Sequence, residues 1–225
     1  MKPLFCAVAF TMITLPMLAQ SGIEVSIGPS VSNVSLAGVN QAIRPNMVSH
    51  TGLEAQVLYH GDLGQNFGFS TGLAYEEKGF RLLESANMNV LNIPFKVGVQ
   101  ANTTLKYISV PLNLKYQFSD GALTAYAFAG PQVGYLVDGF VRTKASALID
   151  FNISKTKLDL TQSIYNRLEI GANIGFGAEL KAGPGAIIAQ AKWNQGFNRV
   201  IDNTIVDLKM RNYGANVNIG YKIYL

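Results

Sequence analysis

The stretch LEIGANIGFGAEL, residues 168–180, decides the fold class of this chain. Its even-numbered residues are Leu, Ile, Ala, Ile, Phe, Ala and Leu, and its odd-numbered residues are Glu, Gly, Asn, Gly, Gly and Glu. Successive side chains of a β-strand point to opposite faces, so one face is apolar and the other carries all the charge. A Lys or Arg on the lipid face at mid-bilayer costs ~2–4 kcal/mol, and the apolar face here has none. The pattern is typical of a strand that crosses a membrane.

The same alternation recurs along the chain, at residues 53–59, 67–75, 108–118, 187–193 and 213–225. Residues 23–27 and 123–137 are less regular, and Gly130-Pro131 in the second predicts a bulge that resets the register. We therefore expect about eight strands. An open sheet edge in hydrocarbon leaves backbone groups unpaired, so the first and last strands should pair. The predicted fold is all-β: a single eight-stranded antiparallel up-and-down transmembrane β-barrel.

The predicted connections alternate in length. Residues 60–66, 119–122 and 181–185 are short and rich in Gly, Asp and Asn, which favours turns. Residues 32–48, 79–104, 138–162 and 196–209 are longer and polar, which predicts loops, although residues 140–160 still alternate and could extend strands above the membrane. Short turns at one end and long loops at the other are typical of the periplasmic and extracellular ends of an outer-membrane barrel.

The composition agrees with export. Of the 225 residues only 14% are charged, against about 25% in ordinary soluble domains. Lys2, the apolar run to Leu15 and a small residue at Ala19 predict a signal peptide over residues 1–20, leaving 21–225 as the barrel domain. Its cleavage would remove Cys6, the only cysteine, so we expect no internal disulfide. The net charge of +4 is too small, and its bases too scattered, to indicate a nucleic-acid partner.

Three motifs carry a family resemblance: YISVPLNLKY at residues 107–116, YAFAGPQVGY at residues 126–135, and GYK at residues 220–222. With them the chain resembles the PorT-like porin family of outer-membrane β-barrels over its whole mature length. Val110 stands where the family usually has Ile, and the chain ends in Leu225 where many such strands end in Phe. The resemblance implies an eight-stranded barrel inserted by the outer-membrane assembly machinery, in a family where a minority of members serve protein secretion.

The polar face of the predicted strands carries charges of both signs. We interpret them as a network of paired charges filling the lumen, because eight strands enclose little more than side chains; a small polar pore or ligand site is the alternative. The predicted lumen charges are Glu54, Glu76, Lys115, Arg167, Glu169, Glu179, Lys192 and Lys222.

Few residues suggest catalysis. His50 follows Ser49 near the predicted outer rim, and His60 precedes Asp62 at a predicted turn, but adjacency in sequence does not place a base against a nucleophile. Ser154 and Lys157 have a Ser-x-x-Lys spacing that we attribute to chance. With no mature cysteine and no Asp-rich loop of calcium spacing, we expect no metal and no cofactor.

Three functions remain open. The first is a non-enzymatic barrel of the cell outer membrane that acts through its long loops, as a structural element, by binding a protein partner, or by supporting secretion or small-solute passage. The second is a lipid-modifying barrel enzyme using His50. The third is a secreted soluble barrel that binds an apolar ligand, in which the apolar face would point inward. The expected partners of the first are outer-membrane lipid and lipopolysaccharide, the assembly machinery and a protein at the long loops.

Overall fold

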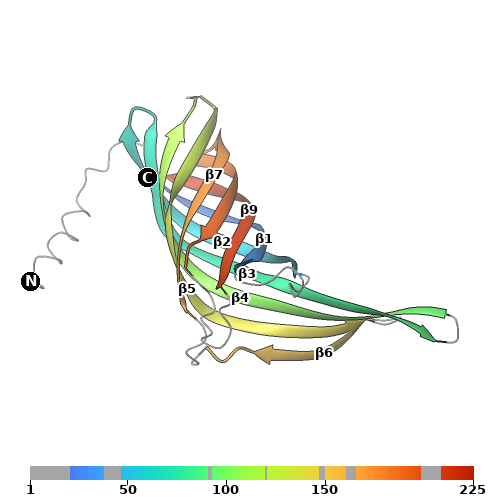
Figure 1. The fold of residues 1–225 in the computed structure, drawn as a ribbon. Helices are drawn as coiled ribbons and strands as arrows, with labels where there is room; N and C mark the ends of the chain where they lie inside the picture. Colours follow the sequence, from blue (N-terminus) through green and yellow to red (C-terminus); the bar gives the residue numbers. More distant parts are fainter. Residues whose placement is uncertain are drawn as a thin grey trace, which may run out of the picture.

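In the computed structural model, nine antiparallel strands account for almost all of the residues that the structure describes (Figure 1). The structure describes residues 21–37, 47–90, 93–119, 121–146, 150–160, 166–198 and 209–225. The predicted signal peptide and Cys6 lie outside these residues. No described residue belongs to a helix long and apolar enough to cross a membrane. The strands are β1 (Gly22–Ala37), β2 (Met47–Gly64), β3 (Phe67–Val90), β4 (Ile93–Gln117), β5 (Leu123–Ser146), β6 (Asp150–Lys157), β7 (Leu168–Ala182), β8 (Gly185–Gly196) and β9 (Lys209–Tyr224).

Eight of these strands close into a ring. Neighbours along the ring are β1, β2, β3, β4, β5, β7, β8 and β9, and β9 pairs back onto β1 from Gly22↔Tyr224 to Ala37↔Lys209. The ring leaves no open edge at the level of the membrane, as hydrocarbon requires. The predicted eight-stranded antiparallel barrel is confirmed. β6 lies outside the ring, as a ninth strand paired to the far end of β5.

The apolar face of each strand points outward. On β7, Ile174 and Phe176 are 62% and 69% exposed, whereas Glu169 and Glu179 on the alternate face are 5% and 4% exposed. On β4 the outward series of Ile108, Val110, Leu112, Leu114, Tyr116 and Phe118 is likewise exposed. A tilted strand of about 9–11 residues spans a bilayer, which matches this series. The arrangement is the opposite of the one that a soluble barrel with an apolar interior needs.

Aromatic side chains gather at both ends of the outward band. Tyr59 and Phe69 lie 5.9 Å apart at the end with short turns, and Trp193 and Tyr213 stack at 5.5 Å at the other. Amphipathic rings favour the membrane–water interface, so these pairs mark its two levels.

The short connections are tighter than predicted. β2 continues through residues 60–64, and the β2–β3 turn has positive φ at Gly64, Gln65 and Asn66. The β7–β8 turn uses Gly183 at φ 61°. Asn and Gly adopt positive φ with little strain. The composition of these segments therefore predicted the turns correctly, although it did not predict where β2 ends.

The predicted long loops at residues 79–104 and 138–162 are largely wrong, whereas the expectation that residues 140–160 could extend strands above the membrane is confirmed by β5 and β6. β3 and β4 stay paired from Gly79↔Thr104 to Val90↔Ile93, and β5 continues to Ser146 alongside β4 and β6. Together these strands form a sheet that extends far beyond the ring on one side, which we call the outer sheet (residues 77–106 and 138–157, as far as described; Figure 1). Parts of the predicted loops at residues 32–48 and 196–209 lie outside the described residues.

The predicted bulge at Gly130-Pro131 is also wrong. β5 pairs with β7 without a break from Leu123↔Leu180 to Tyr135↔Leu168. Gly130 instead serves a close approach, since a Cβ there would lie 1.9 Å from the Leu112 oxygen. The register shifts at Val137, because Tyr107 pairs with Leu136 while Lys106 pairs with Asp138. That extra residue turns Asp138, Phe140 and Arg142 to the outer face.

Candidate functional site in the barrel lumen

The lumen contains buried ionisable side chains from seven of the strands. In the described part of the chain, five glutamates and four lysines inside the ring are buried, and they form three connected groups along the barrel axis. Removing a charge from water costs several kcal/mol, so each needs a partner of opposite sign or several hydrogen bonds. The nine residues are Glu24, Glu54, Glu76, Glu169, Glu179, Lys78, Lys115, Lys192 and Lys222.

The group nearest the short turns is centred on Glu179. Its two carboxylate oxygens accept from Lys115 on β4 and Lys222 on β9, which joins opposite parts of the ring. The Lys115 Nζ also lies 3.8 Å from the centroid of the Tyr126 ring, where a cation is attracted to the π face. Tyr126 fits because Gly177 faces it: a Cβ at Gly177 would lie 2.6 Å from the phenol oxygen.

The central group joins β1, β2, β8 and β9. Glu24 accepts hydrogen bonds from Ser26, Gln56 and Gln190, and its second oxygen lies 2.7 Å from the His60 Nε2. Beside it, Glu54 pairs with Lys192 and accepts from the Asn218 amide at 2.7 Å. These contacts cross the lumen, so the interior is closed by side chains at this level.

The third group lies nearer the outer sheet. The Lys78 ammonium sits between Glu76, at 2.8 Å, and Glu169, at 2.5 Å. Glu169 also accepts from the Asn212 amide, and Glu76 accepts from the Gln132 amide at 2.9 Å. Lys78 stands 5.2 Å from the Tyr107 ring centroid. One lysine thus holds two carboxylates that would otherwise repel each other.

Apolar clusters cover the lumen above the third group. Val34, Phe80 and Met210 pack together on one side, with Met47 and Leu82 against them. Leu105, Tyr107 and Leu136 pack on the other, where Leu158 and Leu160 fold in just after β6. Water therefore meets an apolar layer before it reaches the buried charges from this end.

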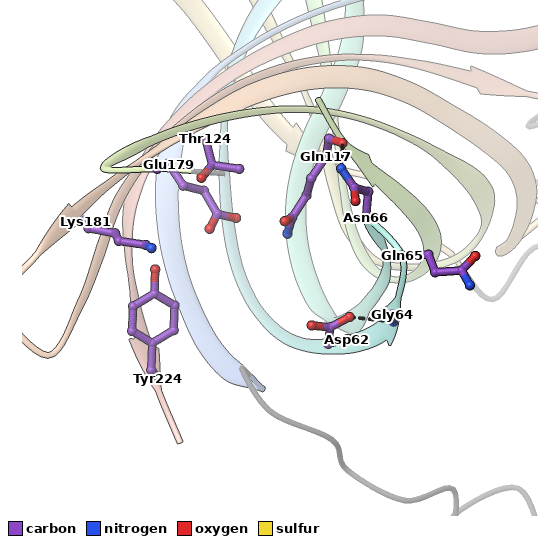
Figure 2. Close-up of a pocket in the computed structure, with 10 residues that line it drawn as sticks. Asp62, Gly64, Gln65, Asn66, Gln117, Thr124, Glu179, Lys181 and Tyr224 are labelled. Atoms are coloured by element: carbon purple, nitrogen blue, oxygen red, sulfur yellow. Dashed lines mark hydrogen bonds between the residues drawn. The ribbon is translucent and has the colours of Figure 1, made fainter. Parts of the chain in front are cut away.

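The opposite end of the lumen is open. A polar cavity of about 370 Å³ lies between the short turns (Figure 2). Figure 2 shows Glu179, Thr124 and Lys181 from one side of the mouth and Asp62 and Gln117 from the other; Gln65 points away. The Asp62 carboxylate is held by the Gly64 N–H at 2.7 Å. The ion pairs of Glu179 form the floor of this cavity.

The two histidines do not meet a nucleophile in the described structure. His50 is buried, its Nδ1 lies 2.9 Å from the Asn102 Oδ1, and its Nε2 has no hydrogen-bond partner. The neighbouring Ser49 uses its carbonyl oxygen to accept from the Arg81 Nε. His60 was expected at a turn but lies inside the lumen on Glu24. Ser154 contacts Thr156, with Lys157 directed toward Asp138, so the Ser-x-x-Lys spacing forms no pair.

The comparisons with known proteins agree with this architecture. The family model described as "Outer membrane protein beta-barrel domain" matches residues 18–202. The chain belongs to this family. Membership places the protein in the outer membrane, and the exposed apolar band is the surface that meets lipid there. No curated protein sequence matches the chain.

Several solved barrels are similar to it in fold. The attachment invasion locus protein Ail of Yersinia pestis is 14% identical, with a TM-score of 0.41 over 91% of this chain and 100% of that one. Neisserial surface protein A is 12% identical, with a TM-score of 0.44 over 92% and 100%. The outer membrane protease OmpT of Escherichia coli is 10% identical, with a TM-score of 0.49 over 94% and 99%.

The structure brings together seven of the eight lumen residues named from the sequence. Arg167 is the exception: it precedes β7, and its guanidinium carbon lies 5.4 Å from the ring centroid of Tyr135, a residue of the outward band. Sequence reasoning missed Glu24, Lys78 and His60. Glu24 lies on the polar side of the alternation along β1, Lys78 lies two residues past Glu76, and His60 lies two residues past Leu58. Extending the two-residue alternation to these positions would have placed all three in the lumen.

Within the described residues, no group of three or more His, Cys, Asp or Glu side chains could hold a metal ion. The acids of the lumen are instead separated by lysines, each of which already binds a carboxylate. The chemistry of the site is therefore that of a set of ion pairs that hold strands together across the barrel.

Proposed function

We propose that this outer-membrane barrel is a non-conducting, non-enzymatic scaffold that holds its outer sheet above the membrane to bind a partner protein. The observation that carries the proposal is the contrast along the axis: the lumen is filled by paired charges and capped by apolar clusters, while β3–β6 continue as paired strands well past the apolar band. A rigid paired extension supports binding better than loops do, because less conformational entropy is lost.

The absence of enzymatic activity is part of the proposal. A lipid-modifying enzyme of this architecture needs a base bonded to a nucleophile at the rim. His50, the residue named for that role, has Asn102 as its partner, and its other nitrogen has no hydrogen-bond partner among the described residues. Replacing His50 with Ala should leave the lipid profile of the membrane unchanged; a lost lipid modification would contradict the proposal.

We also propose that the chain is a PorT-like barrel inserted by the outer-membrane assembly machinery, and that its partner belongs to protein secretion. The support is the strand motifs at residues 107–116 and 126–135, which supply Lys115 and Tyr126 to the lumen. The role of these motifs would then be structural: they place one ion pair and one aromatic ring in a narrow interior.

Conductance tests the closed lumen. The purified barrel, reconstituted in planar lipid bilayers, should show no stepwise current, because the ion-pair groups and the apolar clusters close the lumen at successive levels. Steady single-channel steps from the unmodified barrel would overturn the proposal that it does not conduct.

Shortening the β3–β4 hairpin tests the role of the outer sheet. Removing residues 85–98 and joining the strands by a two-residue turn keeps the register, because Ser85 pairs with Gly98. The variant should still shift in mobility on heating, as a folded barrel does, but should fail to restore secretion or envelope integrity to cells lacking the gene. Full restoration would place the function in the barrel itself.

A further inference from the structure

The register of the outer sheet gathers basic side chains on its outward face. The pairs Asp138↔Lys106, Phe140↔Lys157 and Arg142↔Lys155 put these six residues on one side of three neighbouring strands. Paired residues of an antiparallel sheet point to the same face, so their heads converge. We call this group, with Lys144 two residues further along β5, the basic patch.

Phe140 lies at the centre of the patch. Its ring centroid is 4.6 Å from the Lys155 Nζ, 5.5 Å from the Lys106 Nζ and 5.8 Å from the Arg142 guanidinium carbon. Three cations around one phenyl ring repel one another, and the ring's attraction for each is modest at an exposed site. The arrangement therefore concentrates positive charge that the ring alone does not neutralise.

Carboxylates near the patch are too few to balance it. Asp138 lies 3.7 Å from Lys106 and 3.5 Å from Lys157, and Glu77 on β3 pairs in register with Lys106. Among the residues whose side chains the structure describes, six bases face three acids, even when Asp159 just beyond β6 is counted. The bases are Arg81, Lys106, Arg142, Lys144, Lys155 and Lys157. In the lumen, by contrast, five glutamates face four lysines and His60.

The level of the patch along the barrel axis indicates which anion it can bind. On the same strands, the next outward residues toward the membrane are Ile108, Tyr135 and Val137, which are 38%, 47% and 44% exposed and belong to the apolar band. Hydrocarbon thus ends where the patch begins, and that is the level of the headgroups. Arg167, stacked on Tyr135, adds a cation at this boundary.

We propose that the basic patch binds the phosphate groups of anionic lipids in the outer leaflet. Arg and Lys side chains pair with phosphate through charge-assisted hydrogen bonds, and bases beside a membrane gain from its negative surface. Binding on one side of the ring orients the barrel relative to its lipid neighbours and supports the root of the outer sheet.

Lipopolysaccharide binding by matched variants tests the proposal. The patch variant is Arg142→Gln with Lys155→Gln. Its control is Lys181→Gln, which removes a positive charge from an exposed site at the short-turn end, away from the outer leaflet. For the purified folded barrel in detergent, the patch variant should bind lipopolysaccharide roughly 30-fold more weakly, and the control should lose less than about threefold. Equal losses in the two variants would overturn the proposal.

Two further probes identify the ligand on the unmodified chain, independently of how the variants fold. Dephosphorylated lipopolysaccharide should bind much more weakly than the intact lipid; equal binding would exclude phosphate recognition. Heparin, a soluble polyanion without an acyl chain, should compete poorly. Displacement by heparin at equal concentration would overturn the assignment to lipid and indicate a soluble polyanion instead.

Discussion

The lumen and the basic patch both contain clusters of charged side chains, but the charges are paired in the lumen and unbalanced in the patch. Inside the ring, Lys78, Lys115 and Lys192 each contact a carboxylate and are almost fully buried. On the outer sheet, Lys157 is 80% exposed, and bases outnumber acids. Burial makes an unpaired charge costly, whereas water and ions screen an exposed one. The pairing of charges in the lumen therefore stabilises the barrel, and the excess positive charge on the outer sheet is available to bind an anion.

Breaking one lumen pair should give the largest effect. Lys192→Met leaves Glu54 without its cation, and removing one partner of a buried pair typically costs about 3–5 kcal/mol. The free energy of unfolding in denaturant, measured in lipid vesicles, should fall by that amount. Lys155→Met on the outer sheet is the matched control, with an expected change of about 0–1 kcal/mol.

The double replacement Glu54→Met with Lys192→Met sharpens this test. It removes both charges, so no uncompensated carboxylate remains, and we expect it to be more stable than Lys192→Met alone. A double variant less stable than the single one would mean that the pair itself, rather than the orphaned carboxylate, accounts for the loss.

The outward face gives the next largest effect. Ile174→Arg puts a charge in the middle of the apolar band and should destabilise the folded barrel by about 2–4 kcal/mol. Leu168→Arg, at the end of the same strand and on the same face, should cost only about 0–1 kcal/mol. The two variants are compared by the denaturant concentration at which half of the folded gel band, the band whose mobility shifts on heating, is lost. Equal costs at both positions would argue that hydrocarbon does not contact this face.

The lipid face was predictable from the sequence because two-residue alternation is a strict consequence of strand geometry. Residues 168–180 show it: every predicted outward side chain there is outward, and both glutamates are inside. The same rule placed Glu54 and Lys192 in the lumen from strands that are far apart in the chain. A closed ring then brings them together without further information.

Strand ends were not predictable in the same way. Polar residues from 79 to 104 are compatible with a solvated loop, and only pairing with a partner strand makes them a hairpin. Ending β3 early hid Lys78, and ending β2 at a turn hid the lumen position of His60. Arg167 follows the inward alternation, but it precedes the first residue of β7, where the side chain is free to stack on Tyr135.

The smallest expected effect on stability tests the patch most directly. Asp138→Asn removes the carboxylate that Lys106 and Lys157 share, and a partly exposed pair of this kind contributes about 0–1 kcal/mol, so the unfolding free energy should hardly change. Affinity for lipopolysaccharide should rise roughly fivefold, because one repelling charge leaves the surface that faces the lipid phosphates. Titration of lipopolysaccharide into Asp138→Asn and unmodified barrels measures this. An unchanged affinity at low salt would mean that the lipid does not approach Phe140 and its cations, since a charge so close to them must act on any anion bound there.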